Sequence, residues 1–571
     1  MHHQDVTRRR RGDRASLKGI WSPVFRIIMA VAIPVSMMTT NSLAQDIKIL
    51  KTKLKGGVTN TNPANPATKT SDNILPDGFS LRKIAEGTDP LENPSGVITT
   101  FGNLNDNSLT RTEPDENTYL VLDDNPGGPT PGYDYGRQFL FQGHENGGNL
   151  AYVTRINLDV TDPAHRITLL TPVDNKGLTN FNSIDGSVWN PFTKTLLFTQ
   201  EAGFVTPPPP PASQLPNGGV IEVPVDWPST PRTLYGILGR GGFEGIHPDD
   251  EGNLYIAEDV GGTRVNINPL DPNSVKTAAN PNSFIYRFVP YKVSDLSAGG
   301  KLQALQVWIA EDPLTFVPVD VTTPFGDVFS TNQLKLHTLG TSWPIRWVTV
   351  HDTAKDGMAD FDASAAAKKA GATPFKRPEN LAFLPGSGFN TFFFDATGDT
   401  DATAGMVPAL AARGAWGAIF RVDLNEQSNS GKESKNSKQQ SNKGKISIFA
   451  LGDQFHASFD NLTFVDKNVL LAAEDRGDTL HDQLNILDSV WAYDLRKANA
   501  DPVHFIALGR DAIASDPSGE DNEPTGLLFS DGDPSVTGIL GHKSLDPDDS
   551  RLFFTQQHGL NTVWEVQATG R

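Results

Sequence analysis

The sequence predicts an all-β fold, a six-bladed β-propeller with long loop insertions. The first observation is the composition: the 571 residues include 52 Gly and 41 Pro but only 6 Met. This suits many short strands joined by turns better than a helical bundle. The second is a recurring motif, in which an acidic residue, a small or polar residue and an apolar triplet precede a turn and a second apolar run.

The motif returns six times. Four clear copies begin with an acid and end in an acid or amide; their first acids are Glu244, Glu379, Asp460 and Glu523. Two looser copies keep the apolar runs and end in Glu145 and Glu201. Several copies are followed by a further apolar strand, such as residues 418–422 and 489–493. Antiparallel units repeated at irregular spacing are typical of a propeller, in which radial repetition leaves few exposed edges.

Residues 1–44 resemble a signal peptide. Arginines at 8–11 and 14 precede the apolar run Ile27–Met38, and small residues follow up to Ala44. We expect cleavage after Ala44, so that the protein is secreted or periplasmic. A retained membrane anchor is the alternative, but the run is too short to cross a bilayer and Pro34 interrupts it. Stable membrane insertion is therefore not expected.

The rest of the chain is predicted to hold one folded domain. Residues 45–73 are polar and read as a flexible N-terminal segment. Residues 74–571 are predicted to form the single propeller domain. Two loop insertions are expected, a proline spacer at Pro207–Pro211 and a disordered Ser/Lys/Gln/Asn-rich run at about 425–445.

Charge and cysteine content exclude several functions. Asp and Glu number 67 against 49 Lys and Arg, for a formal charge of -18, so nucleic acid is not an expected partner. The excess indicates either a solvated acidic surface or carboxylates that hold cations. No cysteine is present, which excludes disulfides, thiolate nucleophiles and Cys-ligated metal sites. Any metal is therefore held by oxygen or imidazole.

The repeat predicts a metal site. The innermost strand of each blade runs along the central channel, so an acid at one end of that strand faces the axis once per blade. Like charges gathered there need cations, and calcium takes six to eight oxygen ligands. The alternative for each acid is an ordinary turn residue. The predicted metal ligands are Glu145, Glu201, Glu244, Glu379, Asp460 and Glu523.

Two basic residues and two histidines accompany these motifs. Lys376 and Arg377 directly precede Pro378 and Glu379, and a guanidinium beside a metal cluster suits bidentate binding of a phosphoryl group. A structural ion pair with a carboxylate is the alternative. His144 and His558 are either metal ligands or hydrogen-bonding residues of the channel wall; we favour the second role for His558 and leave His144 open.

The motifs resemble those of the PhoX-type alkaline phosphatases, in consistent order from about Leu75 to Val566. Five segments carry the resemblance: Gly143-His144-Glu145-Asn146 is similar to Asn-His-Glu-Tyr of the family, Phe198-Thr199-Gln200-Glu201 to Leu-Thr-Cys-Glu-Glu, Gly242-Phe243-Glu244-Gly245 to the Ser-His-Glu segment, Arg377-Pro378-Glu379-Asn380 to Arg-Pro-Glu-Asp, and Asp460-Asn461-Leu462 to Asp-Asn-Leu.

The resemblance implies a six-bladed propeller that hydrolyses phosphate monoesters with calcium and iron. It implies that Glu201, Glu244 and Glu379 are metal ligands, and it makes Arg377 and Asn461 the candidate catalytic residues, Arg377 as a phosphate clamp and Asn461 in contact with substrate or metal. The family has a cysteine that bridges its irons where this chain has Gln200, and Ala202 replaces a second Glu. A neutral amide cannot bridge iron as a thiolate does, which argues against iron and leaves calcium.

Three functions follow from these observations. The first is an exported metal-dependent phosphoesterase, similar to alkaline phosphatase, that hydrolyses a small phosphorylated substrate by metal-activated water. The second is a non-catalytic, calcium-stabilised propeller that acts as a binding or scaffold protein. The third is a lactonase-like propeller, against which Lys376 and Arg377 argue because a neutral lactone has little use for them. The sequence indicates neither the substrate nor the oligomeric state.

Overall fold

The computed structural model describes most of the chain beyond residue 72; the described residues are 73–103, 112–146, 150–174, 179, 181–201, 218–268, 276–424, 442–497, 501–509, 523–541 and 550–568. The predicted signal peptide, nearly all of the N-terminal segment and the proline spacer lie outside them. So does most of the predicted insertion at 425–445, although Lys443–Lys445 already belong to a strand. Among the described residues, no helix has the length and apolar character needed to cross a bilayer.

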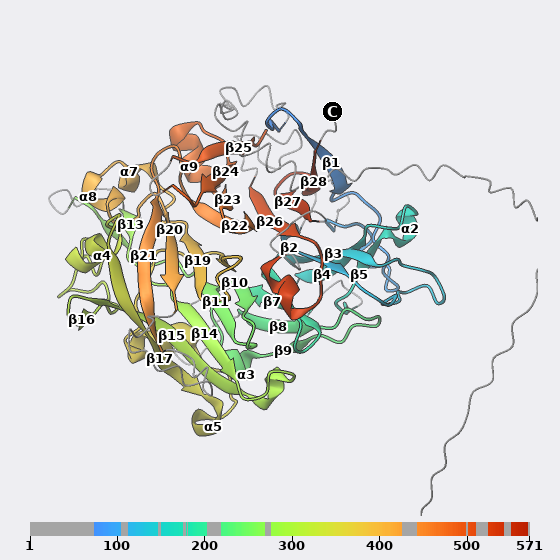
Figure 1. The fold of residues 1–571 in the computed structure, drawn as a ribbon, viewed down its shortest axis with the longest axis horizontal. Coiled ribbons are helices and arrows are strands. Elements are labelled where there is room, and N and C mark those ends of the chain that lie inside the picture. The colour runs from blue at the N-terminus through green and yellow to red at the C-terminus, as the bar shows by residue number, and fades with distance from the viewer. Residues whose placement is uncertain are drawn as a thin grey trace, which may run out of the picture. The chain divides into compact units, whose positions relative to one another are not determined.

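Four antiparallel sheets contain four strands each (Figure 1). They are β2 (Glu113–Val121), β3 (Gln138–Glu145), β4 (Tyr152–Asn157) and β5 (Ile167–Leu169); β6 (Ile184–Asn190), β7 (Thr195–Gln200), β8 (Gly219–Val223) and β9 (Arg232–Thr233); β22 (Phe459–Asp466), β23 (Val469–Glu474), β24 (Ser489–Asp494) and β25 (Val503–Ala507); and β26 (Pro524–Ser530), β27 (Arg551–Gln556), β28 (Thr562–Ala568) and β1 (Phe79–Ala85).

A larger sheet of ten strands contains two further four-stranded runs. In hydrogen-bonded order its strands are β10 (Phe243–Pro248), β11 (Leu254–Glu258), β14 (Ile285–Pro290), β15 (Gly300–Ile309), β17 (Ser342–Asp352), β21 (Lys443–Leu451), β20 (Ala418–Asp423), β19 (Thr391–Ala396) and β18 (Leu381–Phe383), with β16 (Asp312–Pro313) paired to β15. The strand β17 joins the two runs. A separate hairpin consists of β12 (Arg264–Asn266) and β13 (Lys276–Ala279).

The helices of the described residues are short and lie in the connections. They are α2 (Pro163–Arg166), α3 (Tyr235–Leu238), α4 (Thr331–Leu336), α5 (Thr353–Asp356), α6 (Ala363–Ala370), α7 (Ala402–Gly405), α8 (Pro408–Ala411) and α9 (Gly477–Leu484), with 3-10 turns η1 (Leu296–Ala298) and η2 (Val536–Leu540). The fold is therefore nearly all β, as predicted.

The first strands of the successive four-stranded units form a closed ring. Each contacts the next in the order β2, β6, β10, β18, β22 and β26, and β26 contacts β2 again. The N-terminal β1 pairs with the last strand β28, with Phe79 opposite Ala568, so the two ends of the described chain share one sheet. This arrangement confirms the predicted propeller-like fold. The blade number of six stays a prediction, because β17 merges two of the units into one sheet.

Apolar side chains on both faces of the strands hold adjacent sheets together. Phe392, Phe393 and Phe394 follow one another in β19 and all three are buried. Phe393 contacts Phe464 of the next sheet with ring centroids 5.4 Å apart, whereas Phe392 contacts Tyr255 of β11 at 5.3 Å. A strand packed between two neighbouring four-stranded units has a continuous apolar sequence because neither of its faces meets water.

Candidate metal centre

A bulge at the start of the inner strands places the acids. The register between the first and second strands slips at this point in β2, β6, β10, β22 and β26. A bulge adds a residue to one strand and redirects its side chains, and bulges are frequent beside active sites. The first residues of four of these bulges are the acids Asp115, Asp185, Glu244 and Asp460, and Glu116 follows Asp115 in the same bulge. Glu379 stands two residues before β18.

A second set of polar residues follows the end of each second strand. Backbone hydrogen bonds mark the position: Glu201 N–H donates to Ser183, Asp259 to Gly242, Thr397 to Arg377, Asp475 to Ser458 and Gln557 to Glu523. In β3, Glu145 occupies the same place opposite Glu113. Glu145 and Glu201 therefore belong to second strands. The sequence prediction that all six acids occupy one position of the innermost strand is wrong for these two.

Glu523 is also displaced from the predicted position. It is the partner of Gln557 N–H, as Arg377 is of Thr397 N–H, so Glu523 and Arg377 occupy matching places in their sheets. The position of the inner acid is taken in β26 by Thr525, which follows Pro524 as Glu379 follows Pro378. Thr525 Oγ1 donates a hydrogen bond to Asp115. One of the six inner positions is thus a hydroxyl.

Seven carboxylates come together in three overlapping groups. Within each group the nearest oxygens lie within 4.8 Å of one another; the groups are Asp115, Glu145 and Asp185; Asp185, Glu201 and Glu244; and Glu244, Asp259 and Glu379. Four of the six predicted ligands, Glu145, Glu201, Glu244 and Glu379, are therefore gathered from four different four-stranded units, two of which share the ten-stranded sheet. Asp460 and Glu523 belong to none of these groups, although Glu523 is near enough to Asp460 to influence its pKa.

Burial makes this cluster costly to ionise without cations. Desolvation is the main cause that raises the carboxyl pKa values, and repulsion between neighbouring carboxylates adds to it. The pKa of Asp115 is raised to about 6 and that of Glu201 to about 8. The pKa values of Glu145, Asp185, Glu244 and Glu379 are raised well above the ordinary range, and so is that of Asp460, which lies outside the three groups.

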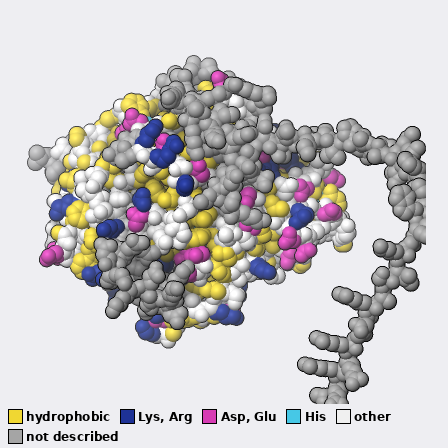
Figure 2. Space-filling model, viewed as in Figure 1, with side chains coloured by type: hydrophobic (Ala, Val, Ile, Leu, Met, Phe, Trp, Pro, Cys, Tyr) yellow, Lys and Arg dark blue, Asp and Glu magenta, His cyan; other side chains and the backbone are white. Residues whose placement is uncertain are grey.

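The donor set fits hard cations. All seven clustered groups offer carboxylate oxygen, the ligand that calcium and magnesium prefer. Asp259 Oδ1 and Asp460 Oδ2 are buried and have no hydrogen-bond partner among the described residues, although buried polar atoms are normally paired. On the face shown in Figure 2, by contrast, acidic and basic side chains are interspersed. The clustered carboxylates can therefore hold metal. This agrees with the interpretation that part of the acidic excess consists of carboxylates that hold cations.

Arg377 lies at the edge of this cluster. Its Nε and Nη2 both bind Asp259 Oδ2, at 2.8 and 2.7 Å, and Nη2 is 3.5 Å from Glu379 Oε1. Its side chain is 26% exposed, whereas those of Asp259 and Glu379 are 3% and 5% exposed. Arg377 also has φ of +52°, an uncommon conformation for a non-glycine residue that is found most often at functional sites. The guanidinium therefore contacts buried acids and is itself partly exposed to solvent.

Lys376 has the structural role considered as its alternative. Its Nζ is 2.5 Å from Asp399 Oδ2, and both side chains are buried. Asp399 Oδ1 also accepts a hydrogen bond from Ala279 N–H, at 2.9 Å. Lys376 therefore ties the segment before Arg377 to β13 and points to a partner outside the acidic cluster.

Asn461 connects two sheets. Its Nδ2 donates to Asp460 Oδ1 at 3.0 Å, and its Oδ1 accepts from Leu527 N–H of β26 at 3.1 Å. The amide thus orients an acid and secures the adjacent inner strand. These contacts do not test the predicted contact with substrate or metal, which stays a prediction.

The two histidines contact polar residues outside the three carboxylate groups. Both ring nitrogens of buried His144 have hydroxyl partners, Thr112 and Thr154, and burial lowers its pKa to about 3. This settles the open choice in favour of a hydrogen-bonding residue. His558 lies 3.3 Å from Glu113 and 3.6 Å from Glu523. These two acids directly precede Pro114 and Pro524.

Gln200 turns to neighbouring polar groups. Its Nε2 donates to the backbone oxygen of Asn182 at 2.9 Å, and its Oε1 accepts from Tyr235 O–H at 2.6 Å. Both ends of the amide are therefore engaged in hydrogen bonds within the protein, and the side chain is fully buried. Gln200 belongs to none of the three carboxylate groups.

Sequence reasoning did not select Asp115, Asp185 and Asp259. Asp185 and Asp259 stood inside recognised copies of the motif, but one acid per copy was taken. Asp115 follows a proline, as Glu379 and Thr525 do; the shared proline is the signal that could have aligned these three inner positions. The bulges obscured the alignment because they shift the inner strand against the second by one residue.

The fold and the site together define a β-propeller-like protein with a buried carboxylate cluster that could hold metal and a partly exposed arginine. Residues 274–558 match the model of the family described as alkaline phosphatase PhoX. The chain belongs to the PhoX family. No curated protein matches the sequence.

Solved structures support the fold. The structure of Pseudomonas fluorescens PhoX in complex with vanadate, a transition state analogue, is similar with a TM-score of 0.50 and 14% identity, over 90% of this chain and 97% of that one. At this identity the similarity shows the fold alone. A Trichoderma reesei carbohydrate-active enzyme of family AA12 aligns with a TM-score of 0.32 and 12% identity, over 90% of this chain and all of the other, which is too low to support an argument.

Proposed function

We propose that the protein is an exported metal-dependent phosphoesterase that acts on small phosphate esters. The observation that carries the proposal is the position of Arg377 at the solvent edge of a buried carboxylate cluster. A phosphoryl group is anionic and needs both cations and a guanidinium to hold its oxygens. Membership of the PhoX family supports phosphate-ester hydrolysis.

Calcium is the metal that we propose. The ligands would be Glu145, Glu201, Glu244 and Glu379, as predicted, together with Asp115, Asp185 and Asp259. These are oxygen donors only, and Gln200 is committed to Tyr235 and Asn182, so nothing here favours an iron pair. When bound, calcium would neutralise phosphate charge and acidify a water molecule.

Arg377 is proposed to orient the substrate. Asp259 holds Nε and Nη2 through a single oxygen, which fixes the plane of the guanidinium. Its Nη1 makes no hydrogen bond or ion pair with the part of the chain that the structure describes. A planar group with an available N–H edge suits an equatorial phosphoryl oxygen. Asn461 would act beside it by orienting Asp460.

Export rests on residues 1–44, which lie outside the described residues. The basic segment, the apolar run and the small residues before position 45 support removal of a signal peptide. Mass spectrometry of the secreted or periplasmic protein should find an N-terminus at Gln45. Full-length chain in the cytoplasm with Met1 or His2 at its start would contradict export.

The activity is tested with the mature chain and 4-nitrophenyl phosphate. We expect phosphate release with calcium and little release in EDTA. Glu244→Gln, which removes a carboxylate from one of the two residues that belong to two carboxylate groups, should lower kcat/KM by about 100-fold or more. The matched control is Glu311→Gln at an exposed position, which should leave the rate unchanged.

Two results would overturn this function. One is absence of phosphate release with calcium, magnesium, manganese, zinc and iron in turn. The other is an unchanged rate in Glu244→Gln. Calcium that raises the melting temperature without any turnover would instead support the non-catalytic binding or scaffold protein.

A further inference from the structure

One residue directly follows each inner acid, or Thr525 in β26, along the inner strands. In ring order these residues are Glu116, Gly186, Gly245, Asn380, Asn461 and Gly526. At Gly186 an added Cβ would collide with the carbonyl oxygen of Glu244, and at Gly245 it would lie 2.8 Å from Asn380 Cα. The inner strands approach one another closely here, which leaves room for only a few longer side chains.

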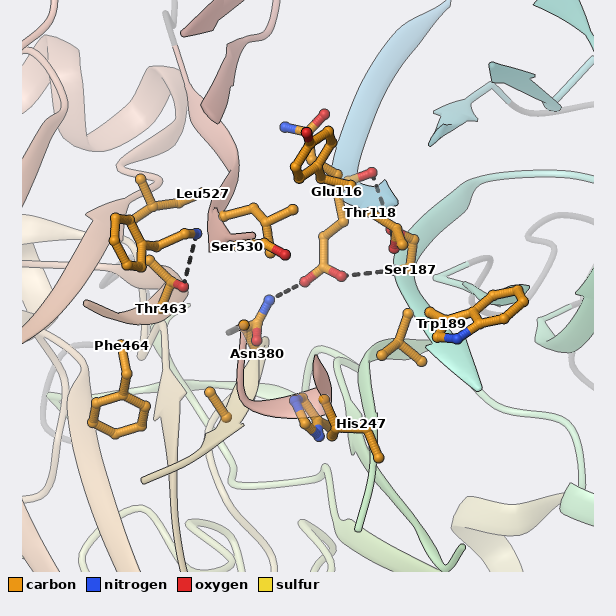
Figure 3. A pocket seen from close by; sticks show the side chains of 18 of the residues that line it. Glu116, Thr118, Ser187, Trp189, His247, Asn380, Thr463, Phe464, Leu527 and Ser530 are labelled. Atoms are coloured by element: carbon orange, nitrogen blue, oxygen red, sulfur yellow. Dashed lines mark hydrogen bonds between the residues drawn. The ribbon is translucent and has the colours of Figure 1, made fainter. Parts of the chain in front are cut away.

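Glu116 is one of these longer side chains, and it bridges three strands (Figure 3). Its Oε2 accepts a hydrogen bond from Ser187 N–H at 2.7 Å, and its Oε1 accepts one from Asn380 Nδ2. Glu116 belongs to β2 and Ser187 to β6, and Asn380 directly precedes β18. Glu116 is 8% exposed. A single buried carboxylate therefore connects the inner strands of three units across the channel.

Each strand that Glu116 joins carries an acid of the candidate metal centre. Glu116 follows Asp115, Ser187 is two residues after Asp185, and Asn380 follows Glu379. Asp115 and Asp185 belong to the first carboxylate group, whereas Glu379 belongs to the third. Glu116 itself is in none of the groups. Its side chain is hydrogen-bonded to Ser187 and Asn380, which lie next to the clustered acids in the sequence.

We infer that Glu116 is a positioning residue that sets the spacing of the metal ligands through its hydrogen bonds to Ser187 and Asn380. The inference rests on the proposed metal-dependent function. Hydrogen bonds to the two oxygens of a buried carboxyl group are directional, and they restrain Asp185 and Glu379 through the backbone next to them. Residues that orient metal ligands commonly change metal affinity 10- to 100-fold when they are replaced.

Two substitutions separate the hydrogen bonds from the charge. In Glu116→Gln the amide oxygen can still accept from Ser187 N–H, and its Nε2 can donate to Asn380 Oδ1 once the Asn380 amide turns over. Glu116→Met has similar length but keeps neither bond. We expect calcium affinity within about threefold of the parent in Glu116→Gln and a loss of about 10-fold or more in Glu116→Met.

The measurement is calorimetric titration of calcium chloride into the metal-free mature chain. The control is Thr118→Val, which removes the 2.9 Å contact between Thr118 and Ser187 hydroxyls in the same place without touching Glu116; its calcium affinity should not change. Circular dichroism and the melting temperature in EDTA show that each variant is folded. If Glu116→Met does not fold, Asn380→Leu removes one of the two bonds and should weaken calcium binding severalfold.

Equal losses in Glu116→Gln and Glu116→Met would overturn the inference in favour of a purely electrostatic effect. Unchanged affinity in both would overturn any positioning role. A parent chain that binds calcium but releases no phosphate would refute the phosphoesterase activity and leave the role of Glu116 intact. A parent that binds no calcium would refute both the inference and the proposed metal.

Discussion

Arg377 places its Nε and Nη2 on the same carboxylate oxygen of Asp259, at 2.8 and 2.7 Å. The second oxygen, Asp259 Oδ1, is buried without a hydrogen-bond partner among the described residues. It belongs to a carboxylate that also lies with Glu244 and Glu379. One side chain therefore serves both parts of the proposed site, since it fixes the arginine with one oxygen and offers the other to a cation.

Replacement of Arg377 should lower the catalytic activity because the planar guanidinium is needed. We expect Arg377→Lys to lower kcat/KM for 4-nitrophenyl phosphate by about 10-fold or more, because lysine is a point charge and cannot keep two N–H groups on Asp259. Arg377→Ala should lower it further and also weaken inhibition by inorganic phosphate. Arg496→Ala, which removes an exposed guanidinium paired with Asp494, is the control. Full activity in Arg377→Lys would show that the paired contacts of Nε and Nη2 with Asp259 are not needed.

Without metal, the protein should lose stability as pH rises. The pKa of Glu201 is raised from its ordinary 4.5 to about 8 by burial and neighbouring carboxylates. The folded state therefore binds protons more tightly than the unfolded state, so the free energy of unfolding falls as pH rises from about 4.5 to about 8. We expect the melting temperature in EDTA to fall over this range and excess calcium to reduce the fall. A melting temperature in EDTA that rises from pH 5 to 8 would contradict this.

Close approach of the inner strands should make Gly186 intolerant of a side chain. A Cβ at this position would collide with the carbonyl oxygen of Glu244 and lie 2.7 Å from Thr199 Oγ1. Gly186→Ala should therefore separate β6 from β10, lower the melting temperature and weaken calcium binding. At Gly261 an added Cβ has no atom within 4 Å, so Gly261→Ala should leave both measurements unchanged. Parent-like calcium binding in Gly186→Ala would show that the strand spacing does not limit the site.

A buried ion network supports the sheet that carries Asp475. Arg476 and Glu474 are fully buried with Nη2 and Oε1 2.8 Å apart, and Arg476 Nε is 3.6 Å from Asp488 Oδ1. Arg476→Met would leave two buried carboxylates without their cation and should cost about 3–5 kcal/mol of unfolding free energy. Urea denaturation measures this loss. Arg496→Ala, at the surface, should change the midpoint little; similar losses in both variants would contradict the special role of burial.

The recurrence of the motif was enough to predict the fold. Apolar triplets such as 392–394 must be buried on both faces, and repetition of such strands with turns between them leaves a propeller as the arrangement that covers them. The same recurrence predicted that Glu145, Glu201, Glu244 and Glu379 meet. Sequence distance did not hide this, because equivalent strands of a radial fold present their ends to one axis.

Position within each unit could not be predicted in the same way. Glu145 ends a second strand and Glu201 directly follows one, whereas Glu244 lies in a bulge of a first strand. A pattern of acid, apolar run and acid looks alike in both cases, since the pattern does not record the register slip. Asp115 was missed for this reason, and Glu523 was placed where Thr525 lies.

By itself the sequence determined the β-class of the fold, the absence of thiolate ligands from any metal site and the identity of most residues of the carboxylate cluster, because composition and recurrence are properties of the chain. Only the tertiary structure decided which acids share a group, that Lys376 pairs with Asp399 and Arg377 with Asp259, and that Glu116 joins three strands. The physical reason is that these contacts depend on register and side-chain direction to within about an ångström, which the close packing of the inner strands sets.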